Sequence, residues 1–283
     1  MLSPHKNRGA PSASGGWSEA GSHTESYYDF SRGVPFMKYI HQLNSWPKFV
    51  WDQGQIASVL GSVRNRQGRL VGRMEALGFH LRSEAVLQTL TLDILKSSEI
   101  EGEILDAAQV RSSIARRLGM DIGGLVFSDR HVDGVVEMML DATQEFDKPL
   151  TKNRLFSWHA CLFPAGRSGM HKIIVGAWRD DKNGPMTVVS GPAGREKVHY
   201  EAPEASRLER EMKNFLIWFN GATRPEQNRR PSLTTGRTRD MDPVLKAGIA
   251  HLWFVTLHPF DDGNGRIARA IADMQLARAD GSR

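Results

Sequence analysis

Residues 258–269 of this 283-residue chain read HPFDDGNGRIAR, which places a base, two carboxylates, two glycines, an amide and two arginines together. A largely apolar run, residues 244–257, precedes the stretch, and an amphipathic segment, residues 267–279, follows it. This periodicity predicts a helix on each side of a short loop. Glycines let a backbone approach a ligand closely, and the amides at a helix N-terminus bind anions. The stretch therefore predicts a loop that handles phosphate.

Four side chains of this stretch suit phosphate chemistry. Arg266 and Arg269 share one face of the second helix, where two guanidiniums can grip a polyphosphate. Asp262 offers a hard oxygen ligand of the kind that Mg²⁺ prefers. His258, with a reference pKa of about 6.5, is suited to act as a general base at neutral pH. Each feature alone is common, and it is their joint occurrence that points to one site.

The composition is that of an ordinary globular protein, with 24% charged and 40% apolar residues. The net charge of +5 comes largely from scattered arginines, which predicts at most weak affinity for nucleic acid. No apolar run approaches the ~20 residues that span a membrane, and the N-terminus lacks the apolar core of a signal peptide. The only cysteine, Cys161, excludes an intrachain disulfide and fits a reducing compartment. We expect a cytoplasmic protein.

The rest of the chain predicts an all-α protein with one small β-hairpin. Apolar periodicity predicts further helices over residues 53–77, 83–101, 106–118, 128–146, 152–162 and 205–219. Gly78 is expected to end the first of these helices and Ser83 to cap the second. β-branched runs at 173–179 and 186–190 predict the hairpin, and residues 197–200 form another candidate strand.

Two segments lack the pattern of a packed structure. Residues 1–36 are rich in Ser, Gly, Pro and His, so we expect them to be disordered, with Met37 as an alternative start. Residues 222–240 are rich in Arg, Pro and Thr and predict a mobile loop.

The stretch at 258–269 resembles the Fic motif, HPF-x-[DE]-GN-G-R-x-x-R, and matches it at every fixed position. The resemblance to the Fic family extends over roughly residues 37–279, and residues 46–52 are similar to the helical domain found ahead of many bacterial Fic cores. It implies an N-terminal helical domain over residues 37–119, which carries an inhibitory helix. It also implies a helical Fic core with a β-hairpin flap over residues 120–283, truncated at its C-terminus.

The resemblance implies transfer of AMP from ATP to a hydroxyl side chain of a target protein, with Mg²⁺ or Mn²⁺ as cofactor. His258 would deprotonate the Ser, Thr or Tyr hydroxyl, and Asp262 would hold the metal on the α- and β-phosphates. Arg266 would grip the phosphates, and Arg269 would bind the γ-phosphate.

The same resemblance assigns the glycines and the amide of the loop. The Asn264 side chain and the amides of Gly263 and Gly265 would form the anion hole. The phosphorylating branch of the family, the Doc toxins, carries Lys where this chain has Gly265, so Gly265 favours nucleotidyl transfer over kinase activity.

A second motif lies at residues 97–102, SSEIEG, which resembles the Fic inhibitory pattern [ST]-x-x-x-E-[GN]. Ser97, Glu101 and Gly102 take its defined positions. The resemblance implies that the Glu101 carboxylate pairs with Arg269 in the place of the γ-phosphate. The alternative is an ordinary solvated glutamate at a helix end.

The predicted hairpin is similar to the Fic flap in position and character. A strand edge there would bind an extended target segment by β-augmentation, with Thr187, Val188 and Val189 as docking residues. The alternative is a structural hairpin that covers the core.

An autoinhibited protein adenylyltransferase is the favoured function. A Fic-fold transferase that uses another donor, for UMP or phosphocholine, or that removes AMP, remains open, as do self-modification and homodimer formation. A non-enzymatic alternative, a nucleotide-sensing or nucleic-acid-binding regulator, draws on the pI of about 9.4 and the Arg-rich segment.

Overall fold

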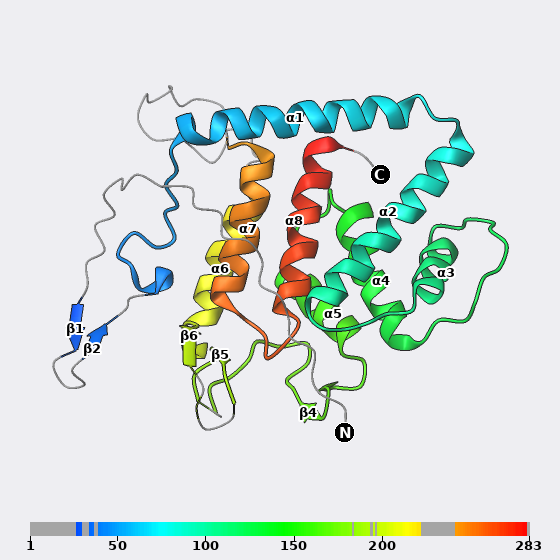
Figure 1. The fold of residues 1–283 in the computed structure, drawn as a ribbon. Coiled ribbons are helices and arrows are strands. Elements are labelled where there is room, and N and C mark those ends of the chain that lie inside the picture. The colour runs from blue at the N-terminus through cyan, green and yellow to red at the C-terminus, as the bar shows by residue number, and fades with distance from the viewer. Residues whose placement is uncertain are drawn as a thin grey trace, which may run out of the picture. The chain divides into compact units, whose positions relative to one another are not determined.

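The helices predicted from periodicity all form. A computed structural model describes residues 27–29, 34–36, 39–182, 184–192, 195, 197–221 and 241–281. Its helices are α1 (Gln53–Glu75), α2 (Phe79–Ile100), α3 (Ala107–Arg117), α4 (Arg130–Gln144), α5 (Lys152–Leu162), α6 (Ala205–Asn220), α7 (Pro243–Leu257) and α8 (Asn264–Asp280), with a short 3-10 helix η1 (Ile40–Gln42) (Figure 1). None of the helices described is long and apolar enough to cross a membrane.

The chain divides into two units, Met1–Lys38 and Tyr39–Arg283. In the first unit the structure describes two short strands, β1 (Tyr27–Asp29) and β2 (Val34–Phe36), which pair antiparallel. The rest of the expected disordered extension, and the expected mobile loop at 222–240, lie outside the described residues.

Acidic and hydroxyl side chains at the N-terminal ends explain where five helices start. Each accepts a hydrogen bond from a first-turn amide that has no partner within its helix. The five caps are Asp52, Asp106, Asp129, Thr151 and Asp242.

The predicted boundary between α1 and α2 is wrong. Gly78 caps the start of α2 instead of ending α1, and Ser83 lies inside the helix. The Arg82 amide donates to the Gly78 carbonyl at 3.0 Å, so helical hydrogen bonding extends back beyond Ser83.

One hydrophobic core unites α2, α3, α4, α5, α6, α7 and α8. In Figure 1, α7 and α8 run side by side and antiparallel, and α2, α4 and α5 lie on the other side of α8. The helix that carries the SSEIEG motif therefore shares its core with the helix that carries the two motif arginines.

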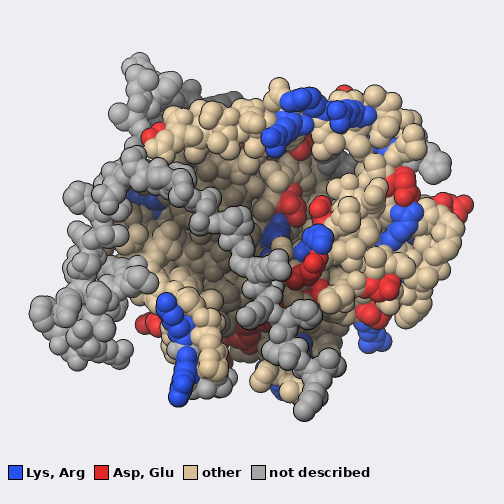
Figure 2. Space-filling view, in the orientation of Figure 1, with Lys and Arg blue, Asp and Glu red and all other residues tan. Residues whose placement is uncertain are grey.

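Helix α1 does not contribute to this hydrophobic core, because none of its residues is buried. It crosses the ends of α7 and α8 (Figure 1), where Arg64 pairs with Asp242 at 3.0 Å and Gln67 donates to Asp280. Figure 2 shows basic side chains along this helix, and acidic and basic side chains together on the face between α8 and α2.

The predicted hairpin uses a different partner strand. Strand β5 (Thr187–Ser190) pairs antiparallel with β6 (Lys197–Glu201), with Val188 opposite Tyr200. A smaller hairpin joins β3 (Arg167–Ser168) to β4 (His171–Lys172). Residues 173–179, the strand expected to pair with 186–190, form no strand.

The hydrogen bonds of residues 173–179 explain this error. The Ile174 amide donates to the Asp261 carboxylate at 2.8 Å, and the Gly176 amide donates to His159 Nδ1 at 3.2 Å. The Arg179 amide donates to the Pro259 carbonyl at 2.9 Å. The β-branched segment is therefore held against the 258–263 loop and α5 instead of a second strand.

Replacement of Leu87 by Ala should test how firmly α2 is built into the core. The Leu87 side chain is fully buried, so its truncation should lower the free energy of unfolding by about 2–5 kcal/mol. Leu92 lies on the same helix but is 50% exposed, so Leu92→Ala should cost less than about 1 kcal/mol. Urea titration followed by circular dichroism measures both, and equal losses would contradict this packing.

Candidate active site

The site begins where α7 ends, at a left-handed residue. His258 has φ 48° and ψ 58°, and among the described residues it is the only non-glycine with positive φ. Such a conformation costs a side-chain-bearing residue about 1–2 kcal/mol. Arg179 stabilises it, because its Nε donates to the His258 carbonyl at 2.8 Å while its own amide holds Pro259.

Arg179 is itself buried and fully engaged. Its guanidinium donates to Asp181 at 2.6 Å and to the Pro203 carbonyl, and its side chain is 1% exposed. This arginine therefore connects Asp181 and Pro203 to His258, the first residue of the motif.

The His258 ring is oriented by a backbone carbonyl. Its Nδ1 lies 3.3 Å from the Val255 oxygen. A carbonyl oxygen can only accept, so Nδ1 carries the proton and Nε2 keeps a lone pair. Burial, aided by the nearby charge of Arg179, lowers the pKa of His258 below its usual value. The imidazole is therefore neutral at pH 7 and can accept a proton at Nε2.

The loop that follows is closed by the Asn264 side chain. Its Oδ1 accepts from the Phe260 amide at 3.0 Å, and its Nδ2 donates to the Phe260 carbonyl at 2.8 Å. The Phe260 ring is fully buried and stacks on His159, with ring centroids 4.2 Å apart. In this structure Asn264 thus serves as a brace for the loop, and its place in an anion hole stays a prediction.

His159 supports the same loop from α5. Its Nδ1 accepts from the Gly176 amide, so its Nε2 is the donor to the Asp262 carbonyl, at 3.2 Å. Burial lowers the pKa of His159 to about 4, which keeps the ring neutral in this role.

The Asp262 carboxylate faces a hydroxyl. One oxygen accepts from the Gly263 amide at 2.5 Å, and the other accepts from the Ser168 hydroxyl. Each oxygen keeps a further lone pair, and a carboxylate beside a hydroxyl is a donor set that suits a hard cation such as Mg²⁺. Among the described residues no group of three His, Cys, Asp or Glu side chains gathers to hold a metal alone. A cation at Asp262 would take further ligands from water or from a phosphate.

Helix α8 starts at the predicted anion site, and a carboxylate of the chain lies there. Gly263 caps the helix with φ 78°, which leaves Asn264, Gly265 and Arg266 in the first turn. The Glu101 carboxylate lies directly against Gly265, where any Cβ would collide with its Oε1. The N-terminus of a helix favours negative charge, so Glu101 occupies the position that an anionic ligand would use.

Arg269 is held by the SSEIEG motif at three points. Its Nη2 donates to Glu101 Oε1 at 2.7 Å and to the Ser97 carbonyl at 2.8 Å, and its Nε donates to Ser97 Oγ at 2.8 Å. Gly102, with φ 80°, turns the chain immediately afterwards. The structure thus brings together the residues that the two motifs singled out, while the inhibitory role of Glu101 stays a prediction.

Arg266 has a partner that the sequence did not suggest. Its Nη1 donates to Glu103 Oε2 at 2.6 Å, and its guanidinium lies over the Phe163 ring at 5.1 Å. The side chain is only 2% exposed.

The hairpin residues proposed for docking lie close to the end of α7. The Tyr200 hydroxyl on β6 donates to the Thr256 carbonyl at 2.6 Å, which anchors the hairpin near His258. Val188 and Val189 on β5 are 43% and 46% exposed, and Thr187 is half-buried.

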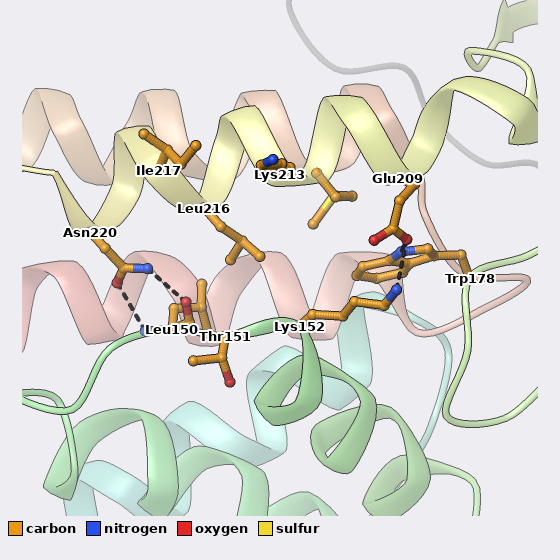
Figure 3. Close-up of a pocket in the computed structure, with 10 residues that line it drawn as sticks. Leu150, Thr151, Lys152, Trp178, Glu209, Lys213, Leu216, Ile217 and Asn220 are labelled. Carbon is orange, nitrogen blue, oxygen red and sulfur yellow. Dashed lines mark hydrogen bonds and ion pairs between the residues drawn. The ribbon is translucent and has the colours of Figure 1, made fainter.

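A cavity of about 460 Å³ lies elsewhere, between α6 and the start of α5. Figure 3 shows the Glu209 carboxylate facing the Trp178 indole and the Lys152 amine, and both donate to it. Leu216 and Ile217 add an apolar wall. The lining contains no residue of either motif, so this cavity is not the candidate site.

Sequence reasoning missed four residues that support the site: Ser168, Glu103, His159 and Arg179. Glu103 alone carried a signal, because it repeats the charge of Glu101 two positions later. The other three lie in segments whose local pattern is that of an ordinary helix, strand or loop, so only the fold reveals their contacts.

Comparison with known proteins agrees with this geometry. Residues 149–276 match the Fic/DOC family, and residues 39–120 match a domain of unknown function, DUF4172. The chain is 26% identical over 192 residues to protein adenylyltransferase fic-1 of Caenorhabditis elegans, which covers 68% of this chain and 32% of that protein. The match therefore spans about a third of that relative.

Solved structures show the same fold. A Fic family protein from Desulfovibrio desulfuricans superposes with a TM-score of 0.51 at 19% identity, covering 83% of this chain and 61% of that one. A Fic domain-containing signalling protein from Bacteroides thetaiotaomicron gives a TM-score of 0.50 at 19% identity, covering 80% and 72%. The mostly helical core and the small hairpins thus agree with these structures, and the Fic/DOC match over residues 149–276 follows the DUF4172 match over residues 39–120.

Proposed function

We propose that this chain transfers AMP from ATP to a Ser, Thr or Tyr hydroxyl of a target protein, and that Glu101 holds it inactive by pairing with Arg269. The observation that carries the proposal is the Glu101 carboxylate, which lies at the N-terminus of α8 and 2.7 Å from Arg269. A bound polyphosphate would require both the N-terminus of α8 and the Arg269 guanidinium. The transferase class follows from the Fic domain, and the name of the fic-1 relative supports adenylyl transfer.

In this mechanism the chain chiefly positions groups and balances charge, which is how enzymes catalyse most phosphoryl-type transfers. The target oxygen forms a bond to the α-phosphorus, the bond to the leaving pyrophosphate breaks, and the hydroxyl proton moves to His258 Nε2. Mg²⁺ or Mn²⁺ held by Asp262 would neutralise charge on the α- and β-phosphates. Arg266, Arg269 and the first amides of α8 would bind the phosphate oxygens.

The target would dock on β5, whose Val188 and Val189 face outward beside a free strand edge in the described part of the hairpin. Main-chain pairing tolerates many sequences, which suits a transferase that reads an extended segment. The lone free cysteine supports a cytoplasmic setting for this reaction.

Replacement of Glu101 by Gly should increase self-modification. It frees Arg269 and the N-terminus of α8 for the γ-phosphate, so label from α-labelled ATP should rise about tenfold or more, which corresponds to only ~1.4 kcal/mol. γ-Labelled ATP should leave no label. Glu99→Gly is a matched control, because Glu99 pairs with Lys96 on the surface of the same helix end. Equal incorporation by the two variants would refute the inhibitor assignment.

Replacement of His258 by Ala in the Glu101→Gly chain should abolish incorporation while nucleotide binding persists, because the base is lost and the phosphate site is kept. Intact mass spectrometry measures the modification. An added AMP supports the proposal, and an added UMP or phosphocholine group would replace it with transfer from another donor. Nucleotide binding without any added group would favour a sensor.

The rate of the Glu101→Gly chain should hold between pH 8 and 7 and fall only at lower pH. The neutral form of His258 is the base, and burial lowers its pKa, so activity is lost as pH falls through a value below about 6.5. Initial rates in buffers of constant ionic strength measure this profile. A midpoint above 7 would contradict the assignment.

A further inference from the structure

The two arginines of the motif are held in different ways. Arg269 is held by the SSEIEG motif at two of its three nitrogens, because its Nε and Nη2 make three hydrogen bonds to Ser97 and Glu101. Arg266 is held at one nitrogen only. Among the described residues, its guanidinium makes a single hydrogen bond, from Nη1 to Glu103. A ligand must therefore displace the partner of Arg269, but not that of Arg266.

The Nε atom of the Arg266 guanidinium has no hydrogen-bond partner in the described part of the chain. This Nε is buried, because only 2% of the side chain is exposed. A buried donor without a partner is costly, and it marks a position where an acceptor is expected. The Phe163 ring on one face restricts the guanidinium further.

Glu103 is fixed from a third element. Its Oε2 also contacts His131 Nε2 on α4 at 3.3 Å, so His131, Glu103 and Arg266 form one chain of contacts. This bond raises the pKa of His131, and although burial alone would raise the pKa of Glu103, its bonds to His131 and Arg266 lower it. Both effects stabilise the charged pair.

We infer that Glu103 is a positioning residue that orients Arg266 toward the phosphates of a bound nucleotide, with His131 holding Glu103 in place. The inference rests on the proposed function and assigns Glu103 a task opposite to that of Glu101, two residues earlier. Glu101 competes with the nucleotide for Arg269, whereas Glu103 keeps its bond to Arg266 when the nucleotide is present.

The test is nucleotide affinity in the full chain that carries Glu101→Gly, measured by fluorescence titration with N-methylanthraniloyl ADP and ATP. Glu103→Ala should weaken both about tenfold, the lower end of what is lost when a residue that orients a ligand is removed. Glu103→Gln keeps an acceptor oxygen without its charge, so it should recover much of the loss and leave about a threefold deficit. Arg266 serves phosphates common to both nucleotides, so the factor should be equal for ADP and ATP.

Glu99→Gln is the matched control and should leave both affinities unchanged. Urea titration checks that each variant folds. If Glu103→Ala does not fold, the inference is tested by the threefold lower nucleotide affinity expected of Glu103→Gln. Affinities equal to the control would overturn the inference. So would a rise in label incorporation by Glu103→Ala when Glu101 is intact, because Glu103 would then belong to the inhibitor. If the Glu101→Gly chain binds ADP but incorporates no label, the proposed AMP transfer is rejected. The role of Glu103 is then still decided by the nucleotide affinities of its variants.

Discussion

The reversal of the chain between α7 and α8 is the constraint on which the site depends. Two left-handed residues, His258 and Gly263, mark its limits, and the Asn264 side chain holds Phe260 by both polar atoms of its backbone. A fully buried aromatic ring fills the turn. The proposed base at the end of one helix and the proposed anion site at the start of the next are thus separated by a braced connection.

Positive charge gathers at the start of α8, and one short segment supplies the opposing carboxylates. Glu101 and Glu103 follow the end of α2, and each pairs with one arginine of α8. Because α2 belongs to the same hydrophobic core as α8, these pairs are held by packing and not by a flexible linker. Disturbing the core under α2 would therefore also disturb the electrostatics of the site.

Much of this arrangement could be predicted from the sequence where its cause is local. Helical periodicity located α1 to α8, and a contiguous motif located His258, the glycines and both arginines. The strand expected at 173–179 does not form, because its amides donate hydrogen bonds to Asp261, His159 and Pro259. The β-propensity of the segment carries no information about these distant partners. Arg179 escaped notice for the same reason, since its partner is the carbonyl of a residue 79 positions away.

The contact between Glu101 and Arg269 has a consequence for the apparent affinity of the site for nucleotide. Under the proposed function, the Glu101 carboxylate would be a tethered competitor of the nucleotide, and its strength would be given by an effective concentration rather than by a dissociation constant. Even short flexible linkers give effective concentrations in the millimolar range. A packed helix such as α2 can give more, because the conformational entropy of ordering the carboxylate is already lost on folding. Any free anion that needs Arg269 must match that local concentration, so the packing of α2 would set the nucleotide level at which the site opens.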